Sequence, residues 1–286
     1  MPADDNPPRG IGAVLETATE ALRDVPDGSP FIEAQILLGL ATGLSRTQML
    51  AWPERNLAPD QETRFADLLN RRIAGEPIAY IRGRQSFWTF DLRVTPDTLI
   101  PRPETELLVE TTLDRLQRTS GLRVADLGTG SGAIAAALAL ERPEWHLIAT
   151  ERSGAALEIA RQNFDDLHLQ RIAPVQTHWL TPFADAGLDA IVSNPPYIAA
   201  VDPHLERGDL RFEPRQALTP EGDGLDAIRV IAVEARRCLR PDGLVAVEHG
   251  FDQGEAVHRI FTAQGLLAVE TRQDLAGLDR ITLGYR

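Results

Sequence analysis

The residues best suited to chemistry form one short run, Asn194-Pro195-Pro196-Tyr197, which directly follows a predicted buried strand. Proline fixes the backbone and has no amide hydrogen, so the carbonyl groups of this run face outward without competing donors. The Asn194 side-chain oxygen and the Pro195 carbonyl can therefore accept the two hydrogens of one planar NH2 group. These hydrogen bonds favour a free nitrogen lone pair and stabilise the positive charge that develops on nitrogen as it attacks. The Tyr197 ring can stack on a planar substrate group.

This run by itself leaves the substrate open. A side-chain amide and the exocyclic amine of a nucleobase present the same planar NH2 group. The plain alternative is a proline-rich turn between a strand and a helix, which is common for two consecutive prolines. The position of Asn194 at the carboxyl end of a strand in an α/β pattern favours the chemical interpretation.

A glycine loop precedes this run in the sequence. The strand Val124–Asp126 leads into Gly128-Thr129-Gly130-Ser131-Gly132 and then into a helix. Glycines let the backbone turn tightly and approach a ligand without Cβ clashes. The spacing Gly-x-Gly-x-Gly, with Asp126 two residues ahead, differs from the Gly-x-Gly-x-x-Gly fingerprint of dinucleotide-binding proteins.

A carboxylate, Glu151, ends the next predicted strand, about 20 residues further on. An acid at this place can accept hydrogen bonds from both hydroxyl groups of a ribose. The alternative is a surface acid at a strand end. Together with the glycine loop, Glu151 predicts a nucleoside cofactor, without saying which one.

Alternating strands and amphipathic helices must position these groups. This alternation predicts a parallel sheet covered by helices on both faces. The last two strand-like runs are joined by a turn around Gly277 and no helix, so we expect an antiparallel hairpin at the sheet edge. The expected strands are Val124–Asp126, His146–Glu151, Ala173–Thr177, Ala190–Asn194, Gly243–His249, Leu267–Gln273 and Arg280–Arg286, and the helices include Ile134–Glu141, Gly154–Leu167 and Leu225–Leu239.

The N-terminal part has a different pattern. From Ile11 to about Ala74 apolar residues recur at helical spacing, which predicts a small helical bundle with Ser45 as one N-cap. Phe87–Val94 alternates as a strand or hairpin does. We predict a helical domain over residues 1–84, a β-hairpin linker over 85–103 and a catalytic domain over 104–286. Because the helical domain offers no chemistry of its own, we expect it to dock the substrate.

Composition restricts the choice of partner. The 286 residues carry 29 lysines and arginines against 42 acids, a formal net charge of −13. This charge opposes tight binding to nucleic acid, which depends on neutralising phosphates. The arginines of one local cluster are interpreted as solvated helix and loop residues. They are Arg71, Arg72, Arg82 and Arg84.

The remaining composition predicts an ordinary cytoplasmic protein. No run of about 18 apolar residues is present to cross a membrane. The single cysteine, Cys238, is expected to be a small buried residue on a helix. The histidines lack the spacing of metal ligands, so no metal site is expected. We expect a monomer in a reducing compartment.

Several runs carry a resemblance that covers nearly the whole chain. The chain resembles the S-adenosylmethionine-dependent amino-methyltransferases and, among them, the release factor glutamine-N5 methyltransferases of the PrmC/HemK type. The two runs that separate this family from enzymes acting on DNA or ribosomal RNA are Pro101–Glu106 and Arg211–Pro214. The full set of matching runs is Gly75–Gly83, Leu99–Glu106, Asp126–Gly132, Val192–Ile198, Arg211–Pro214 with Ala217-Leu218, and Glu248–Gly250.

The resemblance implies an α/β fold, a Rossmann-like seven-stranded class I methyltransferase sheet with a small N-terminal helical domain and a hairpin linker. It implies that Gly128–Gly132, Glu151 and Asn194 bind S-adenosyl-L-methionine and that Trp179 lies against the adenine. Asn194, Pro195, Pro196 and Tyr197 would hold the substrate amide, and the Ile100-Pro101 segment would lie near the methionine end of the cofactor. The implied substrate is the glutamine of the Gly-Gly-Gln loop in class I peptide chain release factors.

Two positions depart from the family pattern. Glu151 stands where aspartate is usual, which keeps the charge and adds a methylene group. His178 also stands where aspartate is common, which puts an acidic contact to the adenine amino group in doubt. Arg102 and Glu213 fit either a ligand-binding role or a structural ion pair. Two other functions stay open: an N-methyltransferase acting on an exocyclic amine of DNA or RNA, and a non-catalytic cofactor-binding scaffold. The acidic charge and the lack of a base-reading domain favour a protein substrate.

Overall fold

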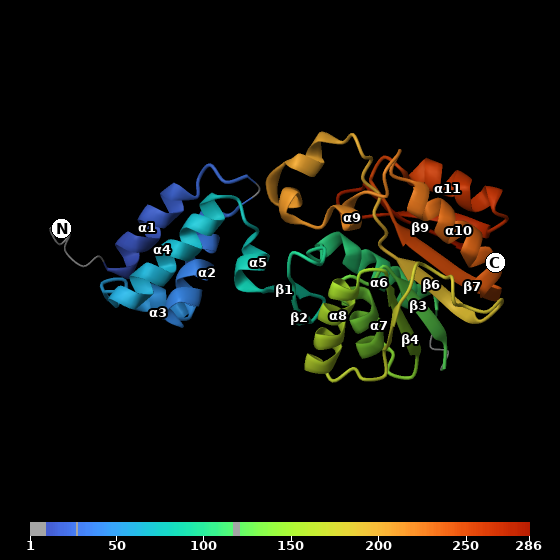
Figure 1. Ribbon diagram of the computed structural model, residues 1–286, viewed down its shortest axis with the longest axis horizontal. Coiled ribbons are helices and arrows are strands. Elements are labelled where there is room, and N and C mark those ends of the chain that lie inside the picture. The colour runs from blue at the N-terminus through green and yellow to red at the C-terminus, as the bar shows by residue number, and fades with distance from the viewer. Residues whose placement is uncertain (1–9, 27, 117–120) are drawn as a thin grey trace. The chain divides into compact units, whose positions relative to one another are not determined.

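The computed structural model describes residues 10–26, 28–116 and 121–286, and the chain forms two compact units. The first, here called the helical unit, contains the chain up to Gly83 together with the segment Glu206–Phe212. The second, the sheet unit, contains Arg84–Leu205 and Glu213–Arg286. Figure 1 shows the elements of both units in chain order.

The helical unit packs its helices around one apolar core, as the spacing of its apolar residues predicts. Leu37 and Leu38 are fully buried in this core. Ser45 caps the third helix as predicted: its Oγ accepts a hydrogen bond from Gln48 N at 3.3 Å, and Gln48 Oε1 accepts one from Ser45 N at 2.8 Å. The helices are α1 (Ile11–Ala21), α2 (Pro30–Thr42), α3 (Arg46–Ala51), α4 (Pro59–Ile73) and α5 (Ile78–Arg82).

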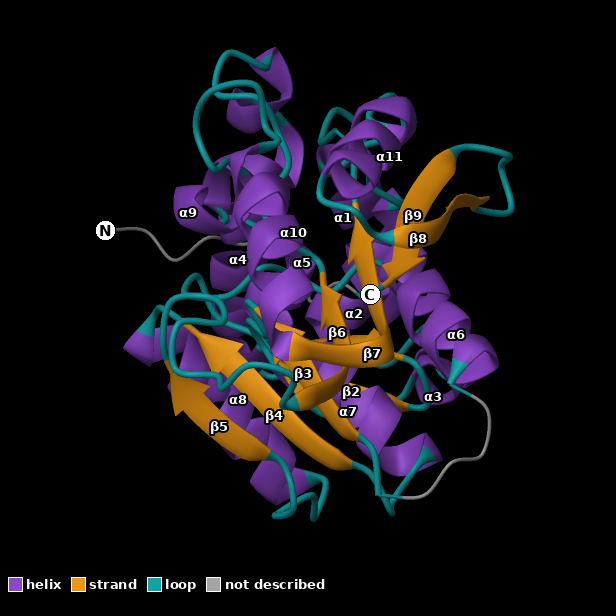
Figure 2. Ribbon diagram, turned by 90° about the vertical axis from the view of Figure 1, so that its right-hand side faces the viewer, coloured by secondary structure: helices purple, strands orange, loops and turns teal. Residues whose placement is uncertain are grey.

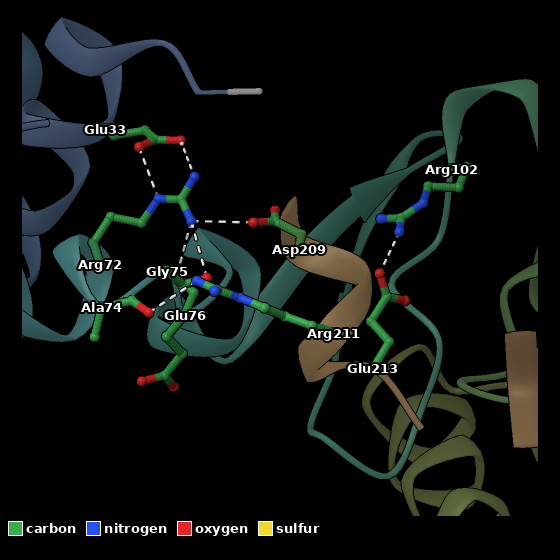
Figure 3. Close-up of polar contacts among 9 residues, drawn as sticks. All are labelled: Glu33, Arg72, Ala74, Gly75, Glu76, Arg102, Asp209, Arg211 and Glu213. Carbon is green, nitrogen blue, oxygen red and sulfur yellow. Dashed lines mark hydrogen bonds and ion pairs between the residues drawn. The ribbon is translucent and has the colours of Figure 1, made fainter. Parts of the chain in front are cut away.

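Arg72, near the end of α4, is buried with 1% of its surface exposed. Its Nε and Nη2 donate to the two carboxylate oxygens of Glu33 at 2.9 and 3.2 Å, and its Nη1 donates to Glu76 O at 3.0 Å (Figure 3). The prediction that this arginine is solvated was wrong. A sequence cluster of arginines does not show that one of them faces a buried carboxylate 39 residues earlier on α2. Arg71, by contrast, is half-exposed and pairs with Glu76.

The segment Glu206–Phe212 lies far along the chain yet belongs to the helical unit. Asp209, in the 3-10 helix η3 (Gly208–Phe212), accepts a hydrogen bond from Arg72 Nη1 at 3.1 Å. Arg211 Nη2 donates to Ala74 O at 3.0 Å, 137 residues away in sequence (Figure 3). Gly75 beside it has a φ of +94°, a conformation that favours glycine. Two runs that carried the family resemblance therefore contact each other here.

The sheet unit is built on a seven-stranded sheet of order β5-β4-β3-β6-β7-β9-β8. The first five strands of this order are parallel, and β9 pairs antiparallel with both β7 and β8. The parallel sheet and the antiparallel C-terminal hairpin are confirmed, with β8 at the edge. The strands are β3 (Arg123–Leu127), β4 (His146–Glu151), β5 (Ala173–Gln176), β6 (Leu188–Ser193), β7 (Leu239–Glu248), β8 (Leu267–Gln273) and β9 (Asp279–Tyr285).

Helices cover both faces of this sheet, as expected for parallel strands. One apolar cluster joins the sheet to α6, α7 and α8, and the other joins it to α10 and α11 (Figure 2). Cys238, the last residue of α10, is buried as predicted. These helices are α6 (Glu106–Arg115), α7 (Ala133–Glu141), α8 (Gly154–Asp166), α10 (Asp226–Cys238) and α11 (Gly254–Ala263), and the short elements are η1 (Pro103–Thr105), η2 (Pro203–Glu206) and α9 (Arg215–Leu218).

The predicted hairpin between residues 87 and 94 is present as β1 (Arg84–Phe87) and β2 (Phe90–Arg93). It is part of the sheet unit, where Phe87 and Leu92 are buried in the same cluster as α6 and α7. Asn163 of α8 fixes β2 by accepting a hydrogen bond from Arg93 N at 2.7 Å. None of the helices within the described ranges has the length and apolarity to cross a membrane.

Candidate active site

The order of the strands brings the two motif loops together. The chain leaves β3 toward β4 and β5, then returns so that β6 pairs with the other side of β3. At the carboxyl ends Leu127 is opposite Ser193, and Ser193 Oγ donates to Leu127 O at 2.7 Å. The next residues, Gly128 and Asn194, therefore begin neighbouring loops. Ligands of open α/β sheets bind at such a reversal of strand order.

The glycine loop has the backbone that its sequence requires. Gly128, Gly130 and Gly132 have φ values of +67°, +55° and +87°, which favour glycine. A Cβ on Gly132 would also lie 2.5 Å from the Phe164 ring of α8. The loop can therefore approach a ligand closely, and its last glycine lets α8 pack directly against it.

The side chain of Asp126, on β3, stabilises this loop through hydrogen bonds. Its buried carboxylate accepts hydrogen bonds from Thr129 Oγ1 at 2.5 Å and from Ala135 N at 3.2 Å. Removal from water raises the pKa of this carboxyl to about 7, against the opposing effect of these two hydrogen bonds. Ser131, the other polar residue of the loop besides Thr129, is also buried.

Glu151 ends β4 beside the loop. Its Oε2 accepts a hydrogen bond from Gly130 N at 3.1 Å and its Oε1 accepts one from Ser153 N at 2.9 Å. Each carboxylate oxygen has a second lone pair, so both can still accept from a ligand hydroxyl. The two backbone contacts hold the carboxylate in place at the cavity wall.

A cavity of about 560 Å³ lies over these loops, within the sheet unit. It is lined by six residues that were predicted from the sequence, namely Gly128, Gly130, Glu151, Trp179, Asn194 and Pro196. The Trp179 ring faces the glycine loop: a Cβ on Gly128 would lie 3.5 Å from it. His178 also lines the cavity, next to Trp179.

The Asn194 run is held by neighbours on both sides. Asn194 Nδ2 donates to Thr105 Oγ1 at 3.1 Å. Tyr197 donates its hydroxyl hydrogen to Glu248 Oε1 at 3.3 Å, and its backbone carbonyl accepts from Gln253 Nε2 at 2.9 Å. Asn194, Pro196 and Tyr197 are partly exposed, and Pro195 is buried.

Other cavity residues had no predicted role. Some belong to Asp97–Leu99, directly before the Ile100-Pro101 segment, and others to Arg215–Ala217 and Thr219–Glu221, after the Arg-Phe-Glu-Pro run. Both segments lie next to runs that carry the family resemblance. This position along the chain is the one feature of the sequence that could have indicated them.

Arg102 and Glu213 form an ion pair with each other (Figure 3). The buried Glu213 carboxylate also accepts a hydrogen bond from Ile100 N at 3.0 Å. These contacts favour a structural ion pair over a ligand-binding role for Arg102 and Glu213. Among the described residues no group of three or more histidine, cysteine, aspartate or glutamate side chains is placed to hold a metal ion.

A parallel sheet extended by an antiparallel pair, with a glycine loop and an acid at its switch point, defines a class I methyltransferase. A solved methyltransferase from Pyrococcus furiosus has this fold: its TM-score is 0.51 at 17% identity, over 77% of this chain and 98% of that one. The PrmC N-terminal domain family matches residues 13–83, and the methyltransferase small domain family matches residues 103–223.

Curated relatives give the family. A release factor glutamine methyltransferase of Xylella fastidiosa is 47% identical over 95% of this chain and 96% of its own length. Another, of Salmonella typhimurium, is 46% identical over 94% and 96%. The chain belongs to the release factor glutamine methyltransferase family.

Proposed function

We propose that this chain transfers a methyl group from S-adenosyl-L-methionine to the side-chain amide nitrogen, N5, of the glutamine in the Gly-Gly-Gln loop of class I release factors. The observation that carries the proposal is the adjacency of two loops: Gly128 and Asn194 line the same cavity at the switch point of the sheet. The family assignment selects the amide over the nucleobase amine. The enzyme would act as a monomer in the cytoplasm.

The cavity suits the proposed cofactor both in its size and in the groups that line it. Its volume of about 560 Å³ is typical of sites for cofactor-sized ligands. In this assignment Gly128–Gly132 let the backbone approach the ligand, Glu151 accepts from the ribose hydroxyls and Trp179 covers the adenine. When bound, S-adenosylmethionine supplies an electrophilic methyl group on a positively charged sulfur.

The Asn194 run orients the amide. Asn194 Nδ2 is engaged by Thr105, so its Oδ1 is the end left for the substrate. Together with the Pro195 carbonyl, this oxygen accepts the two amide hydrogens and stabilises positive charge on nitrogen. Positioning then supplies much of the rate, and no base is required before transfer. The nitrogen loses its extra proton to water afterwards.

Glu151→Gln should weaken cofactor binding by roughly 10- to 100-fold, because hydrogen bonds to a charged group contribute about 1.5–3 kcal/mol. The amide also has one acceptor oxygen for two backbone N–H groups and two ribose hydroxyls. Calorimetric titration of the purified protein with S-adenosylmethionine measures this change. Glu158→Gln, an exposed acid on α8, is the control and should leave the affinity unchanged. An unchanged affinity in Glu151→Gln would exclude the ribose contact.

The helical unit is proposed to dock the release factor. Large apolar side chains are exposed on it, including Phe31, Ile32 and Trp52, each between 44% and 48% exposed. Exposed apolar groups of this kind mark interaction surfaces when they gather in one region. Contact with a whole release factor would then add binding energy that a short peptide lacks.

Incubation with methyl-labelled cofactor tests the substrate. Label should enter a class I release factor, and a release factor with the Gly-Gly-Gln glutamine changed to alanine should stay unlabelled. Mixed DNA and RNA should also stay unlabelled. A short peptide carrying Gly-Gly-Gln should have a higher KM than the whole factor if the helical unit docks it. Label found only in nucleic acid would refute the proposed substrate.

A further inference from the structure

Trp179 is held in a backbone conformation that bulky residues rarely adopt. Its φ is +47°, in the left-handed region, where a large side chain is uncommon. The residue lines the cavity, and its ring lies 3.5 Å from the place that a Cβ on Gly128 would take. Strained conformations of this kind persist only where the surrounding structure fixes the backbone, and they gather at functional sites.

The peptide groups on either side of Trp179 are both fixed by hydrogen bonds. Before it, the His178 carbonyl accepts from Thr181 N at 3.3 Å and from Thr181 Oγ1 at 2.7 Å. After it, Leu180 N donates to Glu234 Oε2 at 2.9 Å. The two soft torsions of Trp179 lie between these peptide groups, so the contacts determine its φ and ψ together.

Helix α10 supplies the contacts that follow Trp179. Arg237, three residues after Glu234 and therefore on the same helix face, donates from Nη2 to Leu180 O at 3.2 Å. Its Nη1 donates to Phe183 O at 2.6 Å. Side chains of one helix face thus bind both backbone polar groups of Leu180. The Leu180 side chain is fully buried in the apolar cluster that contains α10.

The same end of α10 also holds the remainder of the connection to β6. Arg237 pairs with Asp185 at 2.9 Å, and its backbone carbonyl accepts a hydrogen bond from Ala186 N at 3.0 Å. The turn that contains Trp179 is therefore fixed at its far end as well as at Leu180.

We propose that Glu234 and Arg237 are positioning residues that hold Trp179 in place for the adenine of the cofactor. This inference rests on the proposed adenine contact of Trp179. The part of the cavity wall that α10 forms is Asp226, Ala227 and Val230, so Glu234 and Arg237 act from further along the helix, through the backbone of Leu180. A ring that is held in place before binding loses less freedom when the ligand arrives, which increases affinity.

Glu234→Leu tests this role directly. Leucine is similar in size and removes the acceptor, so Leu180 N loses its partner and the turn can relax. The dissociation constant for S-adenosylmethionine should rise roughly 5- to 20-fold, because apparent affinity falls with the fraction of protein in the binding conformation. Glu234→Gln keeps an acceptor oxygen and should stay within about threefold of the parent. Calorimetric titration measures both variants.

Arg237→Met is an independent variant on the same helix face. Methionine keeps an unbranched chain and removes the donors to Leu180 O and Phe183 O, so the dissociation constant should rise roughly 3- to 10-fold. Arg236→Met is the matched control, because Arg236 is exposed on the same helix, and it should leave the affinity unchanged. Urea unfolding of each variant establishes that the titrated protein is folded.

Two further readouts distinguish positioning from a general loosening of the sheet unit. In a Trp179→Ala background, Glu234→Leu should add no loss of cofactor affinity, because it acts only through that ring. At saturating cofactor, Glu234→Leu should keep kcat on a release factor within about twofold of the parent. The Asn194 run retains its own contacts with Thr105 and Gln253 in this variant.

The outcomes separate this inference from the proposed function. If Trp179→Ala keeps the parent affinity, the adenine contact and this inference both fail, while labelling of a release factor still decides the proposed function. If Trp179→Ala binds weakly but Glu234→Leu and Arg237→Met bind as the parent does, only the positioning role is overturned. A glutamine variant as weak as the leucine variant, additive losses in the double variant, or a large fall of kcat at saturating cofactor would also overturn it.

Discussion

Asn194→Ala is expected to lower kcat by roughly 100- to 1000-fold, the loss typical when one preorganised hydrogen-bonding group is removed from an active site. The Asn194 oxygen is one of two acceptors assigned to the substrate amide. Without it, the NH2 group keeps only the Pro195 carbonyl, and the charge that develops on nitrogen loses one of its two acceptors. Cofactor affinity should stay within about threefold, because the glycine loop, Glu151 and Trp179 are unchanged.

Single-turnover rates on a release factor, with cofactor affinity measured in parallel, check this result. Gln162→Ala provides the control, since this exposed amide of α8 lies outside the motif loops. It should leave both quantities unchanged. A parent-like rate in Asn194→Ala would contradict the acceptor role, whereas a large loss of cofactor affinity would show that the cofactor-binding role assigned to Asn194 outweighs its role toward the substrate.

Arg72→Met should lower the free energy of unfolding of the helical unit by about 3–5 kcal/mol, the cost of breaking a buried ion pair from one side. Glu33 is 7% exposed and would be left as an uncompensated buried charge. The Glu76 carbonyl would also lose its donor. Asp209 would lose its contact to α4, and with it one link that holds the segment Glu206–Phe212 in this unit.

Urea unfolding followed by circular dichroism measures the effect, and two transitions are expected if the two units unfold separately. Arg71→Met is the matched control on the same helix. Its ion pair with Glu76 is partly exposed and should contribute less than about 1 kcal/mol. Limited proteolysis near Asp209 should become faster in Arg72→Met alone. Equal stability of the two variants would show that Arg72 is not a buried structural charge.

The elements that the sequence predicted well are those whose signal is local. Gly128–Gly132 requires positive φ at three places, and any strand that leads into it must turn there. The C-terminal hairpin followed from two strand patterns with no helix between them, and Ser45 from a capping residue ahead of a helix. The backbone rules for glycine, proline and capping residues act over a few positions, so a single sequence displays them.

The residues that were missed depend on strand order. Glu248 lies beside Asn194 because β7 pairs with β6, and no spacing in the chain indicates this pairing. Thr105 was part of a recognised run but had no assigned partner until η1 was placed beside β6. The burial of Arg72 was predicted wrongly for the same reason: its partners Glu33 and Asp209 lie 39 and 137 residues away.

The sequence by itself thus determined the chemistry that the chain can offer: an acceptor run for a planar NH2 group, a glycine loop and a strand-end acid. Local spacing suffices there, because each motif is fixed by its own backbone. Tertiary structure alone decided how that chemistry is oriented. The pairing of β3, β6 and β7 sets Asn194 between the glycine loop and Glu248, and long-range packing, which has no local signal, decides which charges are buried.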